Sequence, residues 1–290
     1  MNKINYPIIF THVPRSGGIT LNGIFKNNFP LSQQLEFEIA DYYGTTQIPL
    51  ALFEKMPQEK KDKFLFLTGH ISFGLHEYYK DPCTYLTFFR NPISRIVSYY
   101  EIISNYEKHY LYKTVNDNRL DIKSFLKLKL SAEFDNAQVR QISGIKGVKP
   151  GKCNEDMLEK AIENLEKYYP VFGLTDKYDE SLMVLSKYYN FPTPYYSIQN
   201  QGKNSKNLKI TQEIKDTIYE TNHLDIKFHE YALRRFETLT AQYGENFNED
   251  VIRFKKNNDL LKKIKIGNLP LGVMIRNYYI RNKSNNTNLK

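Results

Sequence analysis

Several residue types and patterns are scarce in this 290-residue sequence, and each absence excludes a class of protein. There is no Trp, and the two cysteines, Cys83 and Cys153, are too few for a disulfide framework, so we expect buried free thiols in a reducing compartment. No uninterrupted apolar run approaches about 18 residues, and no basic segment followed by a long apolar run opens the chain as in a signal peptide. We therefore expect a cytoplasmic globular protein without a transmembrane helix.

Acidic residues are nearly absent from the last forty residues. Residues 251–290 hold ten Lys or Arg and one acidic residue, Asp259, whereas residues 1–250 hold 31 of each sign. The net charge of +9 therefore lies in the tail, which argues against a nucleic-acid partner for the body. We divide the chain into a domain over 1–250 and a basic extension over 251–290. The extension is interpreted as a packed C-terminal helix; the alternative is peripheral contact with an anionic membrane or an acidic partner.

A Walker A loop is also absent, although a glycine turn follows the first strand pattern. Residues 8–13 form an apolar, β-branched run typical of a buried strand, and helical spacing resumes at Leu21. Between them lie Gly17 and Gly18, which let the backbone approach an anion at a helix N-terminus. This order predicts a phosphate-binding loop, although an ordinary strand–turn–helix corner explains the stretch equally well by itself. Because no Gly-Lys-Ser/Thr sequence follows, a generic ATPase is disfavoured.

Strand and helix patterns alternate along the rest of the chain. Apolar strand patterns occupy residues 64–68, 84–89 and 169–174, while residues 28–63 have the pattern of a connection with a short helix. Alternating strands and helices favour a parallel sheet. We therefore expect an α/β protein with a P-loop-like three-layer fold, in which helices flank a central, mostly parallel sheet. Ligands of such sheets bind beyond the carboxyl ends of the strands, where residues 14–18, His70 and Arg90 fall.

Four stretches of the sequence together resemble a known family. They are HVPRSGGIT at residues 12–20, GHISF at 69–73, FRNPISRIVSYY at 89–100 and FGLTD at 172–176. These resemble the sulfotransferases that use 3′-phosphoadenosine 5′-phosphosulfate (PAPS), in the branch of the heparan sulfate 2-O-sulfotransferases and related bacterial proteins, over roughly residues 7–240. The resemblance implies PAPS as co-substrate and transfer of a sulfuryl group to a hydroxyl of an acceptor, such as a saccharide or glycoconjugate.

The resemblance also implies roles for individual residues. The 5′-phosphate is expected at the first loop, formed by Pro14, Arg15, Ser16, Gly17, Gly18, Ile19 and Thr20. The 3′-phosphate is expected at Arg90 and Ser98, with Lys203 in a basic loop near the nucleotide. Arg140 is the candidate residue for binding the saccharide. Arg15 stands where the family usually has Lys; it can stabilise charge on the leaving phosphate but remains protonated.

The reaction needs a base, because an alcohol is a poor nucleophile at neutral pH. His70 is the histidine best placed for this role, and His12 is interpreted as structural. Relatives often have His-Gly-His where this chain has Thr68-Gly69-His70. We expect no metal, since no cluster of His, Cys and carboxylate residues has ligand spacing.

Two other classes of function remain open at this point. One is a P-loop-type nucleotide-dependent kinase, which the lack of a Walker lysine and of a clear magnesium-binding aspartate disfavours. The other is a non-catalytic nucleotide- or saccharide-binding module that kept the fold and lost the chemistry. The acceptor, the position that is sulfated and the oligomeric state are not defined by the sequence.

Overall fold

A central parallel sheet organises the computed structural model, which describes residues 6–37, 49–191, 195–196, 208–263, 265–266 and 269–270. Its four strands lie in the order β2-β3-β1-β4, and the parallel pair β5-β6 continues from it. The strands are β1 (Ile8–Thr11), β2 (Gln34–Glu36), β3 (Phe66–Gly69), β4 (Thr84–Leu86), β5 (Phe88–Phe89) and β6 (Gly173–Leu174). Thr87 alone separates β4 from β5, and its hydroxyl donates to the Thr11 carbonyl at 2.8 Å. A short antiparallel pair, β7 (Lys265–Ile266) and β8 (Leu269–Pro270), lies apart from them.

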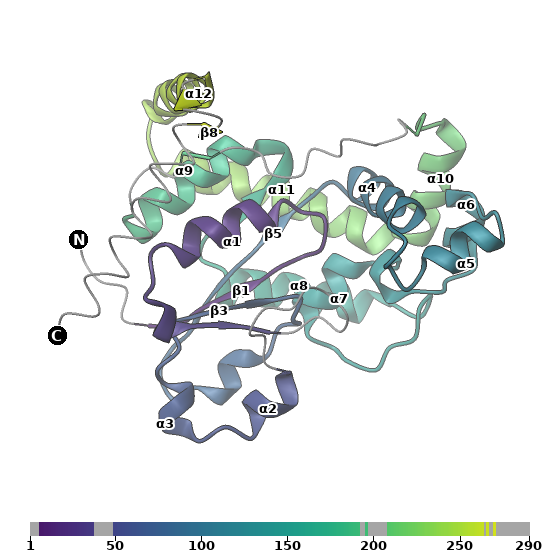
Figure 1. The fold of residues 1–290 in the computed structure, drawn as a ribbon, viewed down its shortest axis with the longest axis horizontal. Coiled ribbons are helices and arrows are strands. Elements are labelled where there is room, and N and C mark those ends of the chain that lie inside the picture. Colours follow the sequence, from purple (N-terminus) through teal and green to yellow (C-terminus); the bar gives the residue numbers. More distant parts are fainter. Residues whose placement is uncertain are drawn as a thin grey trace.

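Helices flank the strands, so the expected α/β class with a mostly parallel sheet is confirmed (Figure 1). In the view of Figure 1, α1 runs above the strands and α2 and α3 lie below them. The helices are α1 (Gly18–Lys26), α2 (Leu50–Glu54), α3 (Gln58–Lys61), α4 (Pro92–Asn105), α5 (Tyr112–Asp117), α6 (Ile122–Lys127), α7 (Ala137–Ser143), α8 (Glu155–Tyr168), α9 (Tyr178–Tyr189), α10 (Gln212–Thr221), α11 (His223–Ala241) and α12 (Phe247–Lys263).

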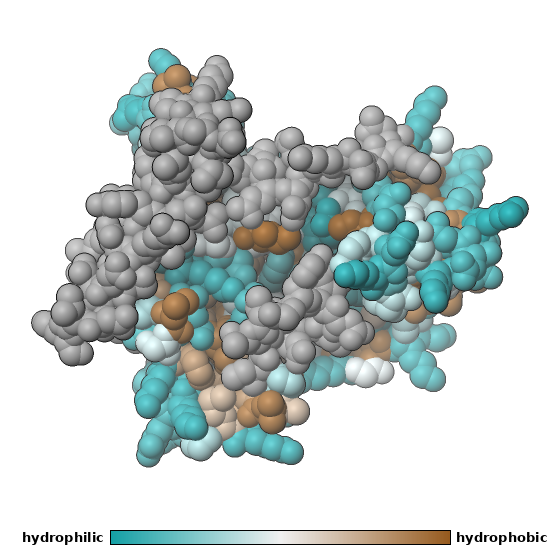
Figure 2. All heavy atoms as spheres, viewed as in Figure 1, coloured by the Kyte–Doolittle hydropathy of each residue, from teal (hydrophilic) through white to brown (hydrophobic). Residues whose placement is uncertain are grey.

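The apolar core forms on both faces of the strands. Ile8, Ile9 and Phe10 are all fully buried, as expected for a parallel strand covered on each side. From α1, Phe25 stacks on Phe66 of β3, with ring centroids 5.7 Å apart. A second apolar cluster joins α4, α5, α6 and α10. On the face drawn in Figure 2, hydrophilic residues gather over this end of the molecule.

Two strand predictions differ from the structure. Residues 34–36 form β2, the edge strand, within a stretch that the sequence indicated as connection and helix. Three residues are too few to show an alternating pattern. The strand predicted over 169–174 shortens to Gly173–Leu174, because Pro170 has no N–H to donate to a neighbouring strand.

The boundary expected between residues 250 and 251 falls inside α12. Val251 and Phe254 are 4% and 3% exposed and belong to the main core, because the apolar face of the helix continues past residue 250. The expected packed helix is therefore present over the first part of the extension. Among the described residues, no helix is long and apolar enough to cross a membrane.

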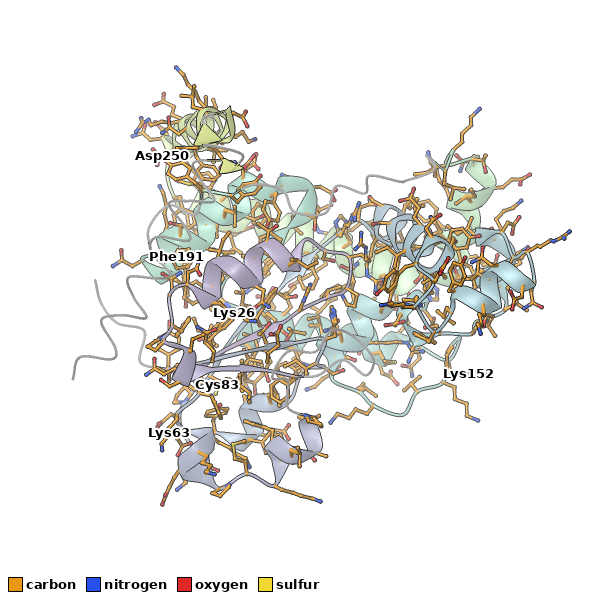
Figure 3. The ribbon with its side chains drawn as sticks, viewed as in Figure 1. Lys26, Lys63, Cys83, Lys152, Phe191 and Asp250 are labelled. Carbon is orange, nitrogen blue, oxygen red and sulfur yellow. The ribbon has the colours of Figure 1, made fainter. Side chains whose placement is uncertain are left out.

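Both cysteines are free, but they are partly exposed rather than buried as expected. Each lies in a connection between elements, where side chains are less covered. Figure 3 shows Cys83 near the strands and Lys152 in the connection between α7 and α8. No disulfide joins the two thiols.

Candidate functional site

Two residues expected at the site, His70 and Arg90, and the histidine interpreted as structural, His12, directly follow the carboxyl ends of three strands. His12 follows β1, His70 follows β3 and Arg90 follows β5. The parallel register pairs Thr11 of β1 with Gly69 of β3, so that His12 and His70 leave the sheet side by side. The fold thus brings together residues that lie up to 78 positions apart in the chain.

Between β1 and α1, the loop at residues 13–17 is held from its carbonyl side. Four consecutive carbonyls accept side-chain hydrogen bonds: Pro14 from Arg95 (3.0 Å), Arg15 from Arg90 (3.0 Å), Ser16 from Thr175 (3.0 Å) and Gly17 from Tyr178 (3.4 Å). Arg15 and Gly17 adopt left-handed φ values of 68° and 79°. Gly17 is the N-cap of α1 and has no side chain to accept from the first turn. The N–H groups of that turn are therefore oriented to bind an anion.

Gly18 allows α1 to begin against the imidazole of His12. A Cβ on Gly18 would lie 2.0 Å from Cδ2 and 2.1 Å from Nε2 of His12. Real Cβ contacts are never this short, so the position accepts no larger residue without displacement of the loop or of His12. This close approach explains the second glycine of the Gly-Gly pair.

Two cationic residues and Ser98 meet beside the loop. Arg15 donates to the Ser98 hydroxyl from Nε at 3.2 Å and from Nη2 at 2.9 Å, although the two residues lie on the loop and on α4. Arg90 donates from Nη1 to the Arg15 carbonyl. Burial, followed by the nearby charge of Arg15, lowers the pKa of Arg90. Two guanidinium groups held together in this way favour an anion between or beside them.

Two buried polar atoms at the loop lack a hydrogen-bond partner among the described residues. They are Oγ of Ser16, a residue with no exposed surface, and Nε of Arg90. Buried polar groups in proteins are nearly always satisfied. Together with the uncapped N–H groups of the first turn of α1, these atoms fit a phosphate-bearing ligand that would complete their hydrogen bonds.

His70 is oriented by a hydrogen bond to the backbone of His12. Its Nδ1 lies 2.6 Å from the His12 carbonyl oxygen. Since a carbonyl only accepts, Nδ1 carries the proton and Nε2 of the neutral ring carries the lone pair. Burial, the largest effect, lowers the pKa of His70 below its ordinary value of 6.5. The ring is therefore neutral at pH 7, which is the form a general base requires.

His12 contacts several parts of the site. Its ring stacks on Phe10 at 5.3 Å and lies 4.3 Å from the His70 ring. Burial lowers its pKa well below 6.5, with smaller contributions from His70 and Arg15. A half-buried, neutral ring packed against Gly18 is consistent with the structural role expected for His12.

Arg95 is a member of the site that the sequence pattern did not single out. It is fully buried and donates to the Pro14 carbonyl and, from both Nη atoms at 3.1 Å, to the Glu133 carbonyl. Burial lowers its pKa. No local signal in the sequence marks Arg95, because it is a basic residue beside Ile96 and Val97 whose burial is decided by the fold. A cation at such a position needs buried acceptors, and the loop supplies one.

Three other residues expected to bind the nucleotide are Ile19, Thr20 and Lys203, and they differ in their surroundings. Ile19, in the first turn of α1, is 50% exposed. Thr20 forms a side-chain hydrogen bond with Tyr178. Lys203 lies outside the described residues.

The structure corrects the expectation for Arg140. Its guanidinium donates to the carbonyls of Asp135 (2.7 Å), Val148 (2.6 Å) and Lys149 (2.9 Å) and pairs with the Asp135 carboxylate. These bonds fix the connection from α7 to α8. Because most of its donors are used within the chain, Arg140 is unsuited to binding a saccharide.

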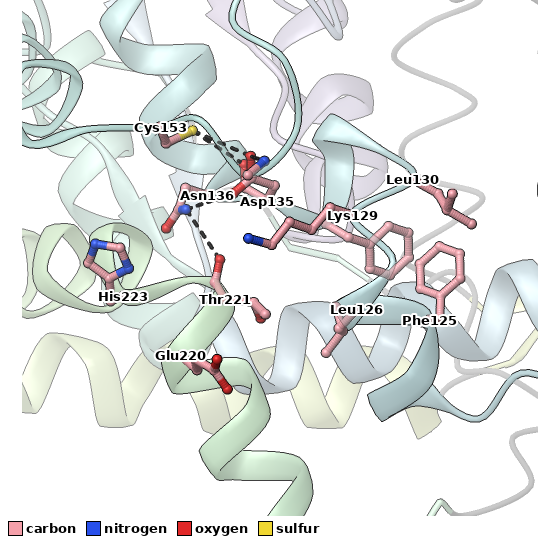
Figure 4. Close-up of a pocket in the computed structure, with 12 residues that line it drawn as sticks. Phe125, Leu126, Lys129, Leu130, Asp135, Asn136, Cys153, Glu220, Thr221 and His223 are labelled. Carbon is pink, nitrogen blue, oxygen red and sulfur yellow. Dashed lines mark hydrogen bonds between the residues drawn. The ribbon is translucent and has the colours of Figure 1, made fainter.

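A cavity of about 110 Å³ lies beside the start of α7, away from the loop (Figure 4). In the close-up, the Lys129 side chain extends toward Thr221 and Asn136, while Phe125, Leu126 and Leu130 form an apolar side. None of its twelve lining residues is among the residues expected to bind nucleotide. This cavity is therefore separate from the site formed by His12, His70, Arg15 and Arg90.

Comparison with known proteins gives little further information. No family model and no curated protein matches the chain. Among solved structures, mouse sulfotransferase SULT7A1 complexed with PAP is similar over 94% of this chain and 89% of that chain, with 12% identity and a TM-score of 0.38. A likeness at that TM-score does not establish an activity, so the function proposed for this chain depends on its own residues.

Proposed function

We propose that the chain is a PAPS-dependent O-sulfotransferase whose acceptor is a hydroxyl of a carbohydrate or glycoconjugate. The observation that carries the proposal is the position of a neutral, oriented histidine beside an anion-binding helix start. His70 and the loop that precedes α1 are linked through the His12 backbone and ring. The four sequence stretches that resemble PAPS-dependent sulfotransferases fall on this same edge of the sheet.

The positions of Arg15 and Arg90 support the proposal that the ligand is a nucleotide with two separate phosphates. The first turn of α1 and Thr20 would bind the 5′-phosphate, where Ser16 Oγ has no partner among the described residues. Arg90 and Ser98 would bind the 3′-phosphate, and the unsatisfied Nε of Arg90 would donate to it. Charge-assisted bonds of this kind are each worth about 1.5–3 kcal/mol. The 3′-phosphate is the group by which the site would distinguish PAPS from ATP.

The proposed reaction is an in-line displacement at sulfur. His70 Nε2 takes the proton of the acceptor hydroxyl while the hydroxyl oxygen bonds to sulfur. The bond between sulfur and the bridging phosphate oxygen breaks, and its electron pair stays on the departing bisphosphate. The N–H groups at the start of α1, which are already oriented before the reaction begins, would stabilise that negative charge, and the guanidinium of Arg15 would add a positive charge beside them.

Ligand-dependent thermal stability tests the proposal. Purified protein is heated with 3′-phosphoadenosine 5′-phosphate (PAP) or with ATP and magnesium; a ligand at a hundred times its dissociation constant adds about 2.7 kcal/mol of stability. We expect stabilisation by PAP that Arg90→Ala removes. In the same variant series, His70→Ala is expected to retain PAP binding and to lose transfer of sulfate from PAPS to saccharide acceptors.

The other outcomes contradict the proposal in distinct ways. Stabilisation by ATP but not by PAP would favour a kinase. Stabilisation by neither nucleotide would favour a saccharide-binding module. Full transfer activity in folded His70→Ala would remove His70 from the role of base.

A further inference from the structure

Two glutamines of α7 contact the two parts of the reaction centre. Gln138 and Gln141 are 0% and 8% exposed, and their spacing of three residues places them on one face of the helix. Burying an amide is costly unless its polar atoms are hydrogen-bonded. In both cases the partners are backbone groups beside candidate site residues, rather than groups of α7 itself.

Gln138 holds the backbone of Arg90. Its Oε1 accepts from the Arg90 N–H at 3.0 Å, and its Nε2 donates to the Arg90 carbonyl at 3.0 Å. The amide thus pairs with Arg90 as a residue of a neighbouring strand would, one position after β5 ends. This pair of bonds fixes the point from which the Arg90 side chain reaches toward the loop.

Gln141 contacts the carbonyl that orients His70. Its Nε2 donates to the His12 carbonyl at 3.1 Å and to the Ile71 carbonyl at 2.9 Å. The His12 carbonyl therefore has two donors, Gln141 and Nδ1 of His70. The Ile71 contact holds the chain directly after His70, and the backbone of Gln141 also accepts from the Phe73 N–H at 2.8 Å.

The start of α7 is anchored to α11. The buried Asp225 carboxylate accepts from the N–H groups of Gln138 (3.2 Å) and Val139 (2.8 Å). Asn136 Oδ1 in turn accepts from the N–H groups of Leu224 and Asp225, each at 3.0 Å. Each helix thus supplies the N-terminal cap of the other, so α7 is a fixed support for the two glutamines.

We propose that Gln138 and Gln141 are positioning residues: Gln138 sets Arg90 for the nucleotide, and Gln141 sets the His12–His70 pair for proton transfer. This inference rests on the proposed function. It assigns the two residues separable effects, although both lie on one seven-residue helix.

The test uses Gln138→Met and Gln141→Met, which keep side-chain length and remove the amide. Gln138→Met is expected to raise the dissociation constant of PAP by about tenfold, with the pKa of His70 unchanged. Gln141→Met is expected to leave PAP binding within about twofold and to raise the pKa of His70 measured by NMR, because the His12 carbonyl then accepts from Nδ1 alone. Gln34→Met is the matched control, since Gln34 Nε2 also bridges two carbonyls, of Lys26 and Phe29, on the edge strand.

A purely structural role would make all three variants alike. Lower melting temperatures with unchanged PAP affinity and unchanged His70 pKa in both α7 variants would overturn the inference. If the methionine variants do not fold, Gln138→Asn and Gln141→Asn provide the same comparison with a shorter amide.

Two ligand-free measurements separate this inference from the proposed function. One is hydrogen exchange at the Arg90 N–H, which Gln138→Met is expected to accelerate; the other is the pKa of His70. Wild-type protein that fails to bind PAP would overturn the proposed function, while these measurements would still decide whether the glutamines hold Arg90 and His70. Unchanged exchange and an unchanged pKa would overturn the positioning roles in either case.

Discussion

Gly18 and His12 contact each other so closely that the imidazole occupies the space of a Gly18 side chain. The ideal Cβ position at Gly18 is 2.0 Å from the nearest ring atom. The contact connects the first turn of α1, where we place the 5′-phosphate, to the histidine whose carbonyl orients His70. Changes at Gly18 are therefore expected to affect nucleotide binding and the base together.

Gly18→Ala is expected to abolish measurable PAP binding, because the loop or His12 must move to admit a methyl group. Calorimetry with PAP measures the effect. The matched control is Gly23→Ala in the same helix, which is expected to keep binding and to gain up to about 1 kcal/mol from helix propensity. If Gly18→Ala bound PAP with wild-type affinity, the proposed connection between the Gly18–His12 contact and anion binding at the first turn of α1 would be contradicted.

The pH dependence of transfer follows from the lowered pKa of His70. Its neutral form is the base, so kcat/KM is expected to be constant near pH 7 and to fall as pH drops through a value below 6.5. In Gln141→Met, the raised pKa is expected to move this fall toward higher pH. A profile whose acid limb lies above pH 7 in the wild type would contradict the assignment.

Stability is expected to depend on pH through His12, whose half-buried ring packs against Gly18. Because its folded pKa is well below 6.5, the unfolded state binds more protons at mildly acidic pH. The contribution of His12 to the free energy of unfolding is thus fully present above about pH 6.5. It decreases as pH falls toward the folded pKa, by at most about 1.4 kcal/mol per pH unit for one histidine. His12→Asn is expected to reduce this slope between pH 6.5 and 5, measured by urea unfolding. An unchanged slope would show that His12 titrates normally.

Thr175 connects the loop to β5. Its hydroxyl contacts the carbonyls of Ser16 at 3.0 Å and Phe89 at 3.1 Å. Thr175→Val keeps the shape and removes the donor, so it is expected to cost about 1–3 kcal/mol of unfolding free energy and to weaken PAP binding. The exposed Thr238 on α11, whose hydroxyl donates to the Arg234 carbonyl at 3.2 Å, offers Thr238→Val as a control with an expected change below about 0.5 kcal/mol. Equal effects of the two substitutions would argue against the loop contact.

Asn136 combines a cap with a left-handed backbone, at φ 48°. Asn136→Gly keeps the backbone and removes the amide that caps α11, at an expected cost of about 1–2 kcal/mol. Asn136→Ala is expected to cost about 1–2 kcal/mol more, because a Cβ is unfavourable in that conformation. Chemical unfolding of the two variants gives the difference. Equal stabilities would show that the backbone conformation relaxes in the folded protein.

The strand segments at residues 8–11, 66–69 and 84–89 and the position of the loop, His70 and Arg90 at their carboxyl ends followed from the sequence alone. Buried strands in a parallel sheet are continuous apolar runs, and the Gly17-Gly18 pair marks the turn before the first helix, so these signals are local. The three-residue β2 and the two-residue β6 carry weaker local signals, and the structure differs from the prediction at both strands.

The tertiary structure decided which of those residues meet. The hydrogen bond from His70 to the His12 carbonyl, the contact of His12 with Gly18 and the use of Arg140 within its own connection depend on positions that only folding brings together. The two glutamines of α7 and the buried Arg95 have no local pattern that distinguishes them from solvated polar residues. Their roles come from burial, because a buried amide or guanidinium must find backbone partners, and in this fold those partners belong to the site.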